Sequence, residues 1–398
     1  MAHLHPFRAL RPVPSKAAEV ACVPYDVINS SEARELAEGK PASFLHVIRP
    51  EIDLEVGTDE HADIVYATGA SNLRAFAKGD DSLQEAVPSL YVYRLIMDGR
   101  SQTGIFGCVS VDDYDNDVIL KHELTRPVKE DDRTRHILEQ QAHAEPVMLT
   151  FKDDEGVATE IGSTMETEAL YDLTADDGVR HTIWRVTNPD RLVNQFQRIR
   201  NLYVADGHHR CKAASRAASE RQGNDEARFF PAVLFPMGDM AILAYNRIVR
   251  TLPEGSAAFI SRLQESFGLK PTDRPVPAAK GDICLYVDGR WYTMTLPPSS
   301  GTQVVDQLDV SRLSEFLLHP LLNISDPRTD PNIDFVGGIR GTSELEKRVD
   351  SGDAALAISM WPTSIQELVD VSDAGLLMPP KSTWFEPKLR SGLLIHLF

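Results

Sequence analysis

The sequence predicts an α/β (α+β) fold divided into two domains. Short apolar runs of strand composition alternate with helix-forming segments along the chain. Two dipeptides, Asp98-Gly99 and Asp288-Gly289, each lie between β-rich runs and predict tight antiparallel hairpins. The chain has 398 residues, of which 42% are hydrophobic, so it is long enough to bury a substantial core in each of two domains.

The N-terminal block, up to about Gly79, is predicted to contain two helices and one strand. Residues 30–39 open with Ser-Ser-Glu, a typical helix start, and residues 62–79 also have helix composition. Between them, residues 43–53 (SFLHVIRPEID) predict a strand and a turn. Residues 89–114 follow as a pair of antiparallel strands around the first Asp-Gly turn.

The middle of the chain alternates between helices and buried strands. Residues 121–141 place a proline near a helix start, and residues 145–151 (EPVMLTF) return to strand composition. His122 and Glu123 therefore lie at a strand-to-helix junction. Residues 188–199 predict another helix, and residues 229–252 predict two buried strands.

The C-terminal part is predicted to be a smaller α/β domain. We place the boundary near Leu252-Pro253, which divides the chain into residues 1–252 and residues 253–398. The second domain should contain a helix over 256–267, the second Asp-Gly hairpin, and a helix-strand-helix unit from Ser343 to Gly375.

Composition narrows the classes of function. A formal charge of -18 repels a polyanion, so we do not expect a nucleic-acid partner. No run approaches the roughly 20 apolar residues of a membrane span, and the first residues have no signal-like run, so we expect a cytoplasmic location. The four cysteines are widely spaced without a CxxC pair, which predicts neither a disulfide framework nor a thiolate zinc site.

The segment Asp206-Gly207-His208-His209-Arg210 is the most informative in the chain. A glycine between an apolar strand and a helix lets the backbone turn tightly, so that the first helical N–H groups face a bound anion such as phosphate. Arg210 offers a forked cationic donor, and His208 and His209 offer donors that also move protons near neutral pH. Asp206 is expected to orient one of these groups or to hold a magnesium ion.

Two other interpretations of this segment remain open. Asp-Gly can simply make a turn, with surface histidines and with Arg210 paired to a neighbouring carboxylate. Alternatively, His208, His209, His122 and Glu123 include the ligand types of zinc or iron, although adjacent histidines diverge in direction on a strand or a helix.

Glu123 is a candidate proton acceptor. It follows His122 and precedes Arg126, so a carboxylate lies beside a cation that can hold phosphate oxygens. The alternative is an ordinary solvated helix start.

Two C-terminal segments carry candidate substrate contacts. Lys381, Ser382 and Thr383 follow two prolines, which predict an extended segment whose donors could surround an anion. Asn246 and Arg247 are placed at the end of an apolar strand, where side chains often enter a cleft. Each segment could equally be an ordinary loop or strand terminus.

The motif YVADGHHR, followed by an Ala-rich helix, resembles the phosphate-binding motif of the ParB/sulfiredoxin superfamily, and within it most closely the free-serine kinases. Further segments recur in the same order over about two thirds of the chain. They are HE at 122–123, EPVML, AYNR, the helix-strand unit before Trp361, and GLLMPPKSTWFEPK. The N-terminal block instead resembles a widespread bacterial family of long uncharacterised proteins that share this core.

The resemblance implies a ParB/sulfiredoxin-like core with a mixed sheet, an N-terminal extension and a C-terminal domain that completes the substrate cleft. It implies transfer of phosphate from ATP or ADP, with Mg²⁺, to the hydroxyl of free L-serine, with Glu123 as base. Gly207, His208, His209, Arg210 and Arg126 would contact the nucleotide. Asp206 would support them or magnesium, His122 would assist Glu123, and Asn246, Arg247, Lys381, Ser382 and Thr383 would contact serine or phosphate.

Two departures leave donor and acceptor open. The stretch between HE and DGHHR is longer than in the compact kinases, and AYNR replaces their aromatic-aromatic-Pro run. The alternative from another class is a ParB-like nucleotide-binding regulator without kinase activity, against which the acidic charge and the lack of a helix-turn-helix pattern argue. A sulfiredoxin-like hydrolase or redox-repair enzyme is disfavoured because His208 stands where sulfiredoxins carry cysteine.

Overall fold

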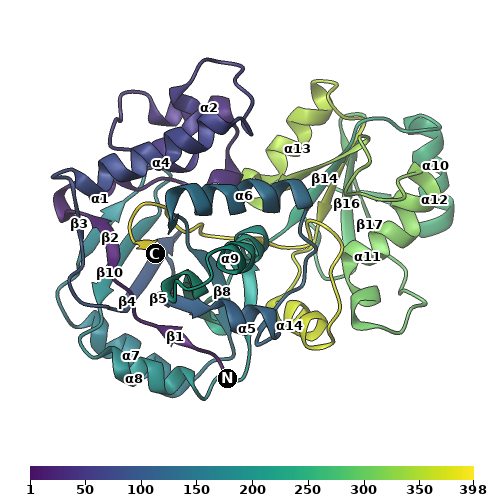
Figure 1. The fold of residues 1–398 in the computed structure, drawn as a ribbon. Coiled ribbons are helices and arrows are strands. Elements are labelled where there is room, and N and C mark those ends of the chain that lie inside the picture. Colours follow the sequence, from purple (N-terminus) through teal and green to yellow (C-terminus); the bar gives the residue numbers. More distant parts are fainter. The chain divides into compact units, whose positions relative to one another are not determined.

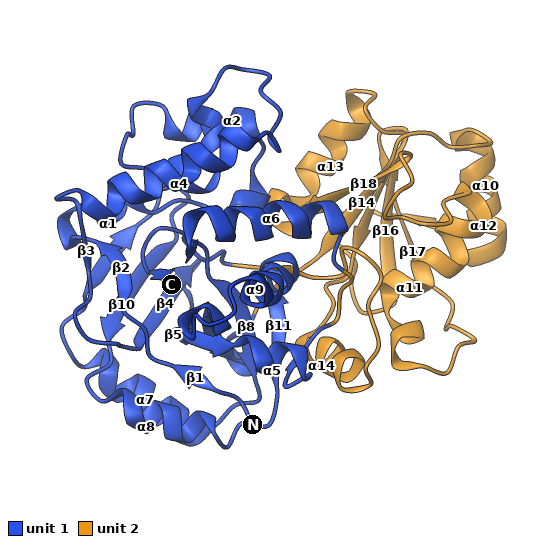
Figure 2. Cartoon of the chain, viewed as in Figure 1, with its two compact units in different colours: residues 1–121, 125–240, 387–398 blue, residues 122–124, 241–386 orange.

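The computed structural model describes residues 1–398 as two compact units (Figure 2). Unit 1 contains Met1–Lys121, Thr125–Met240 and Pro387–Phe398, and unit 2 contains His122–Leu124 and Ala241–Glu386. The predicted boundary at Leu252-Pro253 falls inside unit 2. None of the helices is long and apolar enough to span a membrane.

Unit 1 is built on a mixed sheet of nine strands. β8 pairs antiparallel with β11 but parallel with β12, and β6 is parallel to β11. The predicted α/β (α+β) class with a mixed sheet is thereby confirmed. In spatial order the strands are β6 (Ile119–Leu120), β11 (Leu202–Asp206), β8 (Val147–Phe151), β12 (Phe229–Pro236), β5 (Arg100–Ser110), β4 (Tyr91–Met97), β10 (Arg180–Arg185) and β9 (Tyr171–Thr174), with β1 (Leu4–His5) on β5.

Hydrophobic residues of these strands form the core of unit 1. Val92, Ile105, Leu149, Val204 and Leu234 come from five different strands and are fully buried. A second, four-stranded sheet joins segments far apart in sequence. Its order is β3 (Ser82–Gln84), β2 (Ala9–Pro12), β21 (Ile395–Leu397) and β7 (Ala142–His143).

The hairpin predicted at Asp98-Gly99 joins β4 to β5 and is confirmed. Asp98 has φ 51° and Gly99 has φ 77°, so both central residues occupy the left-handed region that a two-residue hairpin turn requires.

The helices of unit 1 cover its sheets. α9 packs on β8 and β12, and α6 packs on α9 (Figure 1). The contact between the helices is lined by Ile137, Ala213 and Ala217, whose small alanine side chains allow close approach. The helices are α1 (Ala17–Val20), α2 (Ser30–Ala37), α3 (Leu45–Ile48), α4 (Asp63–Lys78), α5 (Val111–Asp115), α6 (Pro127–Gln140), α7 (Glu155–Met165), α8 (Pro189–Phe196) and α9 (His208–Glu220).

The strand predicted over residues 43–53 was wrong. The segment forms α3 and then a 3-10 helix, Pro50–Asp53. Phe44, Leu45, Val47 and Ile48 are all buried, and this spacing of one, three and four residues fits one face of a helix, not the alternation of a strand.

Unit 2 is built on an antiparallel sheet of six strands. Its core includes Ile248, Cys284, Val336 and Leu345. The strands are, in order, β15 (Lys270–Pro271), β17 (Arg290–Thr295), β16 (Asp282–Val287), β19 (Leu356–Met360), β14 (Tyr245–Val249) and β18 (Ile333–Gly337), and β13 (Ile242–Leu243) pairs separately with β20 (Trp384–Phe385). The helices are α10 (Ser256–Phe267), α11 (Asp309–Leu313), α12 (His319–Leu322), α13 (Gly341–Asp350) and α14 (Ile365–Asp373).

β14 belongs to unit 2 because it pairs with both β18 and β19. The two buried strands predicted over 229–252 therefore lie in different units, β12 in unit 1 and β14 in unit 2. The predicted hairpin at Asp288-Gly289 joins β16 to β17, and the predicted unit from Ser343 to Gly375 corresponds to α13, β19 and α14.

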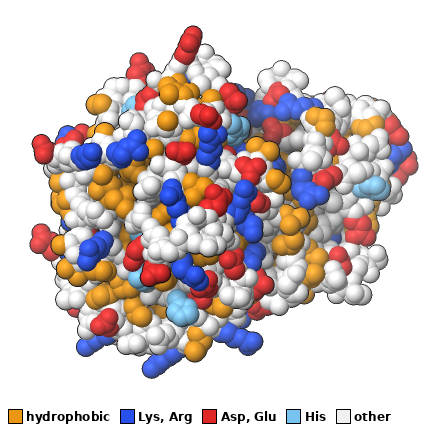
Figure 3. Space-filling view, viewed as in Figure 1, with side chains coloured by type: hydrophobic (Ala, Val, Ile, Leu, Met, Phe, Trp, Pro, Cys, Tyr) orange, Lys and Arg blue, Asp and Glu red, His pale blue; other side chains and the backbone are white.

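Charges of both signs are present on the surface. The chain has 41 Lys and Arg against 59 Asp and Glu, and Figure 3 shows both kinds of side chain interspersed across the visible face.

Candidate functional site

The turn between β11 and α9 has the geometry expected from the sequence. Gly207 has φ 102° and ψ 32°, and the first helical bond runs from Cys211 N–H to Gly207 O at 2.9 Å. The amides that precede Cys211 therefore stand at the positive end of the helix dipole. A Cβ at position 207 would lie 3.0 Å from Arg210 Nε and 3.1 Å from Val147 Cγ1, so the turn has no room for a larger residue without adjustment.

Arg210 is buried and holds this turn together. Its Nη2 lies 3.0 Å from Asp206 Oδ2 and 3.7 Å from Asp26 Oδ2, and its Nη1 donates to the carbonyl oxygen of Pro146. Burial lowers the pKa of Arg210, but Asp26, Asp206 and Glu145 outweigh it and raise that pKa above its ordinary value. The pairing with a neighbouring carboxylate, one of the two alternatives left by the sequence, is thus present.

Asp206 faces two cations. Besides Arg210, Lys388 Nζ lies 3.6 Å from Asp206 Oδ1. Mg²⁺ prefers an octahedral set of oxygen ligands, and two cations beside one carboxylate repel a third. Asp206 alone is therefore a poor magnesium site, and most ligands would have to come from phosphate groups and water.

The two histidines of the turn diverge, as expected for neighbours on a helix. Burial lowers the pKa of His208 to about 3, so its ring is neutral near pH 7. Proton transfer by His208 near neutral pH stays a prediction, and a lowered pKa does not favour it. His209 is half-buried, and its Nε2 accepts a hydrogen bond from Arg126 N–H at 3.1 Å. Arg126 is the N-cap of α6 and its side chain is exposed, so the structure brings Arg126 to the turn.

Glu145 and Arg133 form a buried ion pair that the sequence did not indicate. Arg133 Nη1 lies 3.6 Å from Glu145 Oε2, while Glu145 Oε1 accepts a hydrogen bond from Tyr25 N–H at 3.1 Å. Burial raises the pKa of Glu145, although Arg210 and Arg133 oppose this effect. Tyr25 lies more than a hundred residues before Arg133 and Glu145, so no local pattern could have identified this cluster.

A small cavity of about 40 Å³ adjoins this ion pair. Arg133, Glu145 and Arg210 are among its lining residues. Arg210 is the one residue of the Gly207 turn that lines this cavity.

His122 and Glu123 lie in the chain between β6 and α6, which confirms the predicted strand-to-helix junction. His122 is buried and Glu123 is half-buried. Glu123 and Arg126 are three positions apart in the chain, so their Cα atoms lie at most about 11 Å apart. The chain therefore keeps Glu123 within that distance of a residue that contacts His209.

Unit 2 brings together most of the predicted C-terminal residues. Arg247 Nη2 donates to Lys381 O at 3.1 Å, and Ser382 Oγ donates to Pro379 O at 2.6 Å. Asn246 Oδ1 accepts from Met360 N–H at 3.0 Å, which ties β14 to β19.

Two local expectations for this region were wrong. Asn246 and Arg247 stand near the start of β14, not at the end of a strand, because the chain pairs with β18 only from Tyr245 onward. Lys381 has φ 57°, so the segment turns there, although the two preceding prolines predicted an extended chain. Thr383 lies just after this turn and is half-buried.

Arg247 is a buried cation without a carboxylate partner. It is 3% exposed, and its hydrogen bonds go to the backbone carbonyl oxygens of Tyr245 and Lys381. Burial lowers its pKa to about 10, so it remains charged near pH 7. A buried charge is costly unless an opposite charge neutralises it, so this loop is suited to bind an anion.

The fold and these residues define an α/β protein with a strand-turn-helix junction at Gly207 and a separate buried guanidinium, Arg247, that has no carboxylate partner. The chain belongs to the family described as "Protein of unknown function (DUF1015)", whose model matches residues 4–311. No curated protein matches the sequence.

Solved structures show distant likenesses. The match with a free serine kinase in complex with AMP covers 72% of this chain and 92% of the kinase chain. The sequence identity is 11% and the TM-score is 0.37. SbnI with a C-terminal truncation, from Staphylococcus aureus, is 13% identical over 73% of this chain and 87% of its own, with a TM-score of 0.39. A conserved hypothetical protein from Pyrococcus furiosus is 11% identical over 72% of this chain and 95% of the Pyrococcus chain, with a TM-score of 0.35.

Proposed function

We propose that the protein is a nucleotide-dependent phosphotransferase that phosphorylates the hydroxyl of free L-serine, or of a similar small metabolite, with ATP or ADP as donor. The observation that carries this proposal is the turn at Gly207, whose φ of 102° lets α9 begin directly after β11. The uncompensated charge of Arg247 supports it, because an amino-acid acceptor carries a carboxylate.

The nucleotide phosphates are assigned to the start of α9. The helix amides, His209 and Arg126 supply donors or positive charge there, and neutral His208 can donate one ring N–H. Arg210 is engaged by Asp26 and Asp206, so a phosphate that reaches Arg210 must displace Asp26, the more distant of the two carboxylates at 3.7 Å. One anion then replaces another on the same guanidinium.

Magnesium is assigned to the bound nucleotide, with Asp206 as at most one protein ligand. When bound, the ion would neutralise charge on the phosphate oxygens. Asp206 itself keeps Arg210 and Lys388 in place, so its substitution should disturb the turn even without metal.

Glu123 is the proposed base, with His122 beside it. A primary hydroxyl has a pKa far above neutral, so the base takes its proton late, as the phosphoryl group arrives. Arg247, Lys381, Ser382, Thr383 and Asn246 are assigned to the acceptor. Arg247 provides the buried charge, and its hydrogen bond to Lys381 O holds the loop beside it.

Phosphorus NMR tests the proposal directly. Purified protein is incubated with Mg²⁺ and L-serine and, in separate samples, with ATP or ADP. We expect an O-phosphoserine signal that Glu123→Gln reduces by about 10²- to 10⁴-fold, the usual contribution of a positioned base. Nucleotide binding without product would favour another acceptor or the ParB-like regulator, and absence of nucleotide binding would reject the phosphate site.

A further inference from the structure

Residues 23–28 form a strap that links two anchored points of unit 1. Before the strap, Cys22 forms a β-bridge with Ser391, with backbone N···O distances of 3.2 Å and 3.0 Å. After the strap, Asn29 is the N-cap of α2, and its side chain takes part in a capping box. The strap itself contains the 3-10 helix Tyr25–Val27. Its middle is therefore held between two ends that have their own contacts.

Tyr25, in the middle of the strap, is held from two sides. Its side chain is buried, and the guanidinium carbon of Arg133 lies 3.9 Å from the centroid of its ring. A cation placed over an aromatic ring is attracted to it, more strongly where both are shielded from water. Glu145 Oε1 accepts the hydrogen bond from Tyr25 N–H at 3.1 Å, and Ser391 Oγ donates to the same oxygen at 3.4 Å. We call Tyr25, Arg133 and Glu145 the latch, because Arg133 and Glu145 also pair with each other.

Asp26 follows the latch residue Tyr25 and reaches the Gly207 turn. Its Oδ2 lies 3.7 Å from Nη2 of Arg210. Tyr25 and Asp26 are consecutive in the chain, so contacts that fix Tyr25 also limit where Asp26 can go. A tethered group competes with a free ligand at an effective concentration that depends on the length and stiffness of its tether. The latch therefore strengthens the competition between Asp26 and any anion that approaches Arg210.

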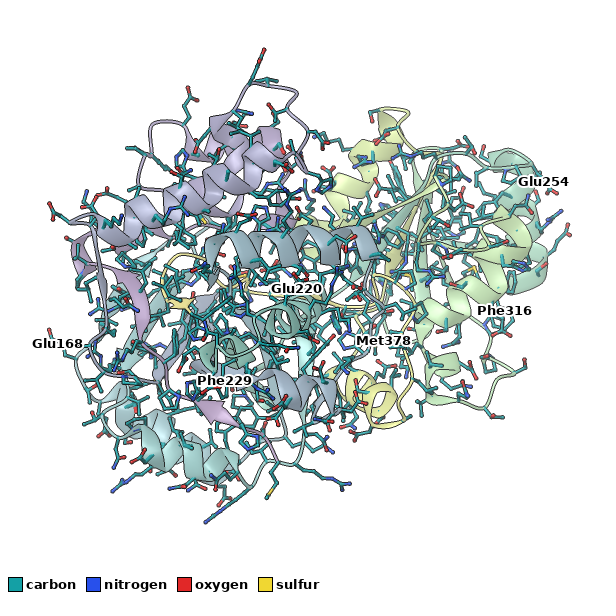
Figure 4. All side chains as sticks on the ribbon, viewed as in Figure 1. Glu168, Glu220, Phe229, Glu254, Phe316 and Met378 are labelled. Carbon is teal, nitrogen blue, oxygen red and sulfur yellow. The ribbon has the colours of Figure 1, made fainter.

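The latch and Arg210 adjoin the same small cavity. Arg133 lies on α6 and Arg210 on α9, the helix that ends at Glu220 in Figure 4, and the two helices pack on each other. Arg133, Glu145 and Arg210 line the cavity of about 40 Å³, which has room for about three water molecules. Their side chains are therefore not all packed directly against one another, and they have space to shift when Asp26 leaves Arg210.

We propose that the strap is a gate at the nucleotide-phosphate site, and that Arg133 and Glu145 are positioning residues that hold the gate shut. In the ligand-free protein Asp26 occupies Arg210. A nucleotide phosphate takes the place of Asp26, and the strap then loosens between its anchored ends. The gate rests on the proposed function, which assigns nucleotide phosphate to Arg210, and it gives the N-terminal block a role in controlling access to that site.

Tyr25→Leu tests the latch without changing the charge around Arg210. The substitution keeps an apolar side chain but removes the ring that Arg133 contacts. In calorimetric titration of the full-length protein with ADP, we expect the affinity to rise by about two- to fivefold, in the lower part of the range for coupled neighbouring residues. Tyr25→Phe keeps the ring, so it is the matched control and should bind ADP like the unaltered protein.

Combination with Asp26→Asn separates the gate from a general effect of loosening the chain. The latch acts through Asp26, so Tyr25→Leu should add nothing to the affinity gained by Asp26→Asn. A gain from Tyr25→Leu that survives in the Asp26→Asn protein, or a loss of affinity in Tyr25→Leu, would overturn the gate.

Hydrogen exchange measured by mass spectrometry reports on the strap itself. Without ligand, the peptide that covers the strap should exchange faster in Tyr25→Leu than in the unaltered protein, and ADP should speed its exchange in the unaltered protein. Glu145→Gln is the second variant, in case Tyr25→Leu does not fold, because it removes the charge paired with Arg133. Slower exchange of the strap on ADP binding would mean that the strap closes over the ligand and would contradict the gate.

The gate and the proposed function fail in different ways. If neither the unaltered protein nor Asp26→Asn binds ADP, the assignment of phosphate to Arg210 fails, and the gate fails with it. If ADP binds but no latch variant changes its affinity or the exchange of the strap, the nucleotide site stands and the gate alone is overturned.

Discussion

At the scale of single residues, the charges around Arg210 decide how the proposed phosphate site works. Asp206 belongs to the local motif, but Asp26 comes from the N-terminal block, and both approach the same nitrogen of Arg210. Asp26 is the more exposed of the two, with a side chain 37% exposed against 27%. Under the proposed function, a nucleotide phosphate would therefore displace Asp26 rather than Asp206 from Arg210.

Asp26→Asn should strengthen nucleotide binding. The substitution removes a negative charge that competes with phosphate, and a gain of about 1 kcal/mol would correspond to roughly fivefold in affinity. Calorimetric titration with ADP measures the effect, and Arg210→Lys should weaken binding in the same assay. Asp176→Asn is the control, because Asp176 pairs with Lys40 on the surface. If Asp26→Asn and Arg210→Lys both bind ADP with the same affinity as the unaltered protein, phosphate does not contact Arg210.

Buried neutral histidines should make the protein less stable in acid. His181 is fully buried, and burial lowers its pKa to about 3, whereas in an unfolded chain it is about 6.5. The unfolded state therefore binds more protons below pH 6.5, so the stability from neutral His181 is present above that pH and is lost as pH falls toward 3. At about pH 5.5 the loss is about 1.4 kcal/mol for this residue.

Urea unfolding at about pH 7.5 and about pH 5.5 measures this dependence. His181→Gln should reduce the difference in unfolding free energy between the two conditions by about 1.4 kcal/mol. The exposed His319 gives the control, since His319→Gln should leave the difference unchanged. An unchanged difference in His181→Gln would mean that this ring is not kept neutral.

At the scale of elements, the change of direction from β11 to α9 depends on one glycine. Gly207 combines a positive φ with close neighbours on two sides, Arg210 and Val147. Backbone strain of this kind costs about 1–3 kcal/mol in a residue with a side chain.

Gly207→Ala should lower both stability and nucleotide affinity. Gly223→Ala is a matched control, because Gly223 also has positive φ, at 90°, but a Cβ there meets nothing within 4 Å. Both variants should lose stability in urea unfolding, with the larger loss for Gly207→Ala. Only Gly207→Ala should weaken ADP binding. If both variants bind ADP with equal affinity, the Gly207 turn does not contact the nucleotide.

At the scale of the whole molecule, unit 2 is largely a single insertion into unit 1. Its ends meet, because β13 pairs with β20 and Glu386 N–H donates to Ala241 O at 3.3 Å. Unit 2 also has its own six-stranded sheet and its own core.

Residues 241–386 should therefore fold when expressed alone. We expect strand and helix signals in circular dichroism, dispersed amide resonances and one cooperative urea transition. A fragment without cooperative unfolding would show that unit 2 depends on unit 1 for stability.

The sequence alone determined the elements that follow local rules. Both Asp-Gly hairpins, the Gly207 turn, the start of α6 at Pro127 and the helix over 256–267 depend on backbone preferences of a few neighbouring residues. The same rules failed at residues 43–53 and at Lys381, where packing selected another conformation.

Only the tertiary structure decided the environments of the charged residues. Asp26 pairs with Arg210, and Lys388 pairs with Asp206. Burial lowers the pKa of His208, and Arg247 has no carboxylate partner. The tertiary structure also assigned β12 and β14 to different units. Each of these outcomes depends on contacts between segments far apart in the chain, because burial and charge pairing are properties of the folded surroundings of a residue and not of its neighbours in sequence.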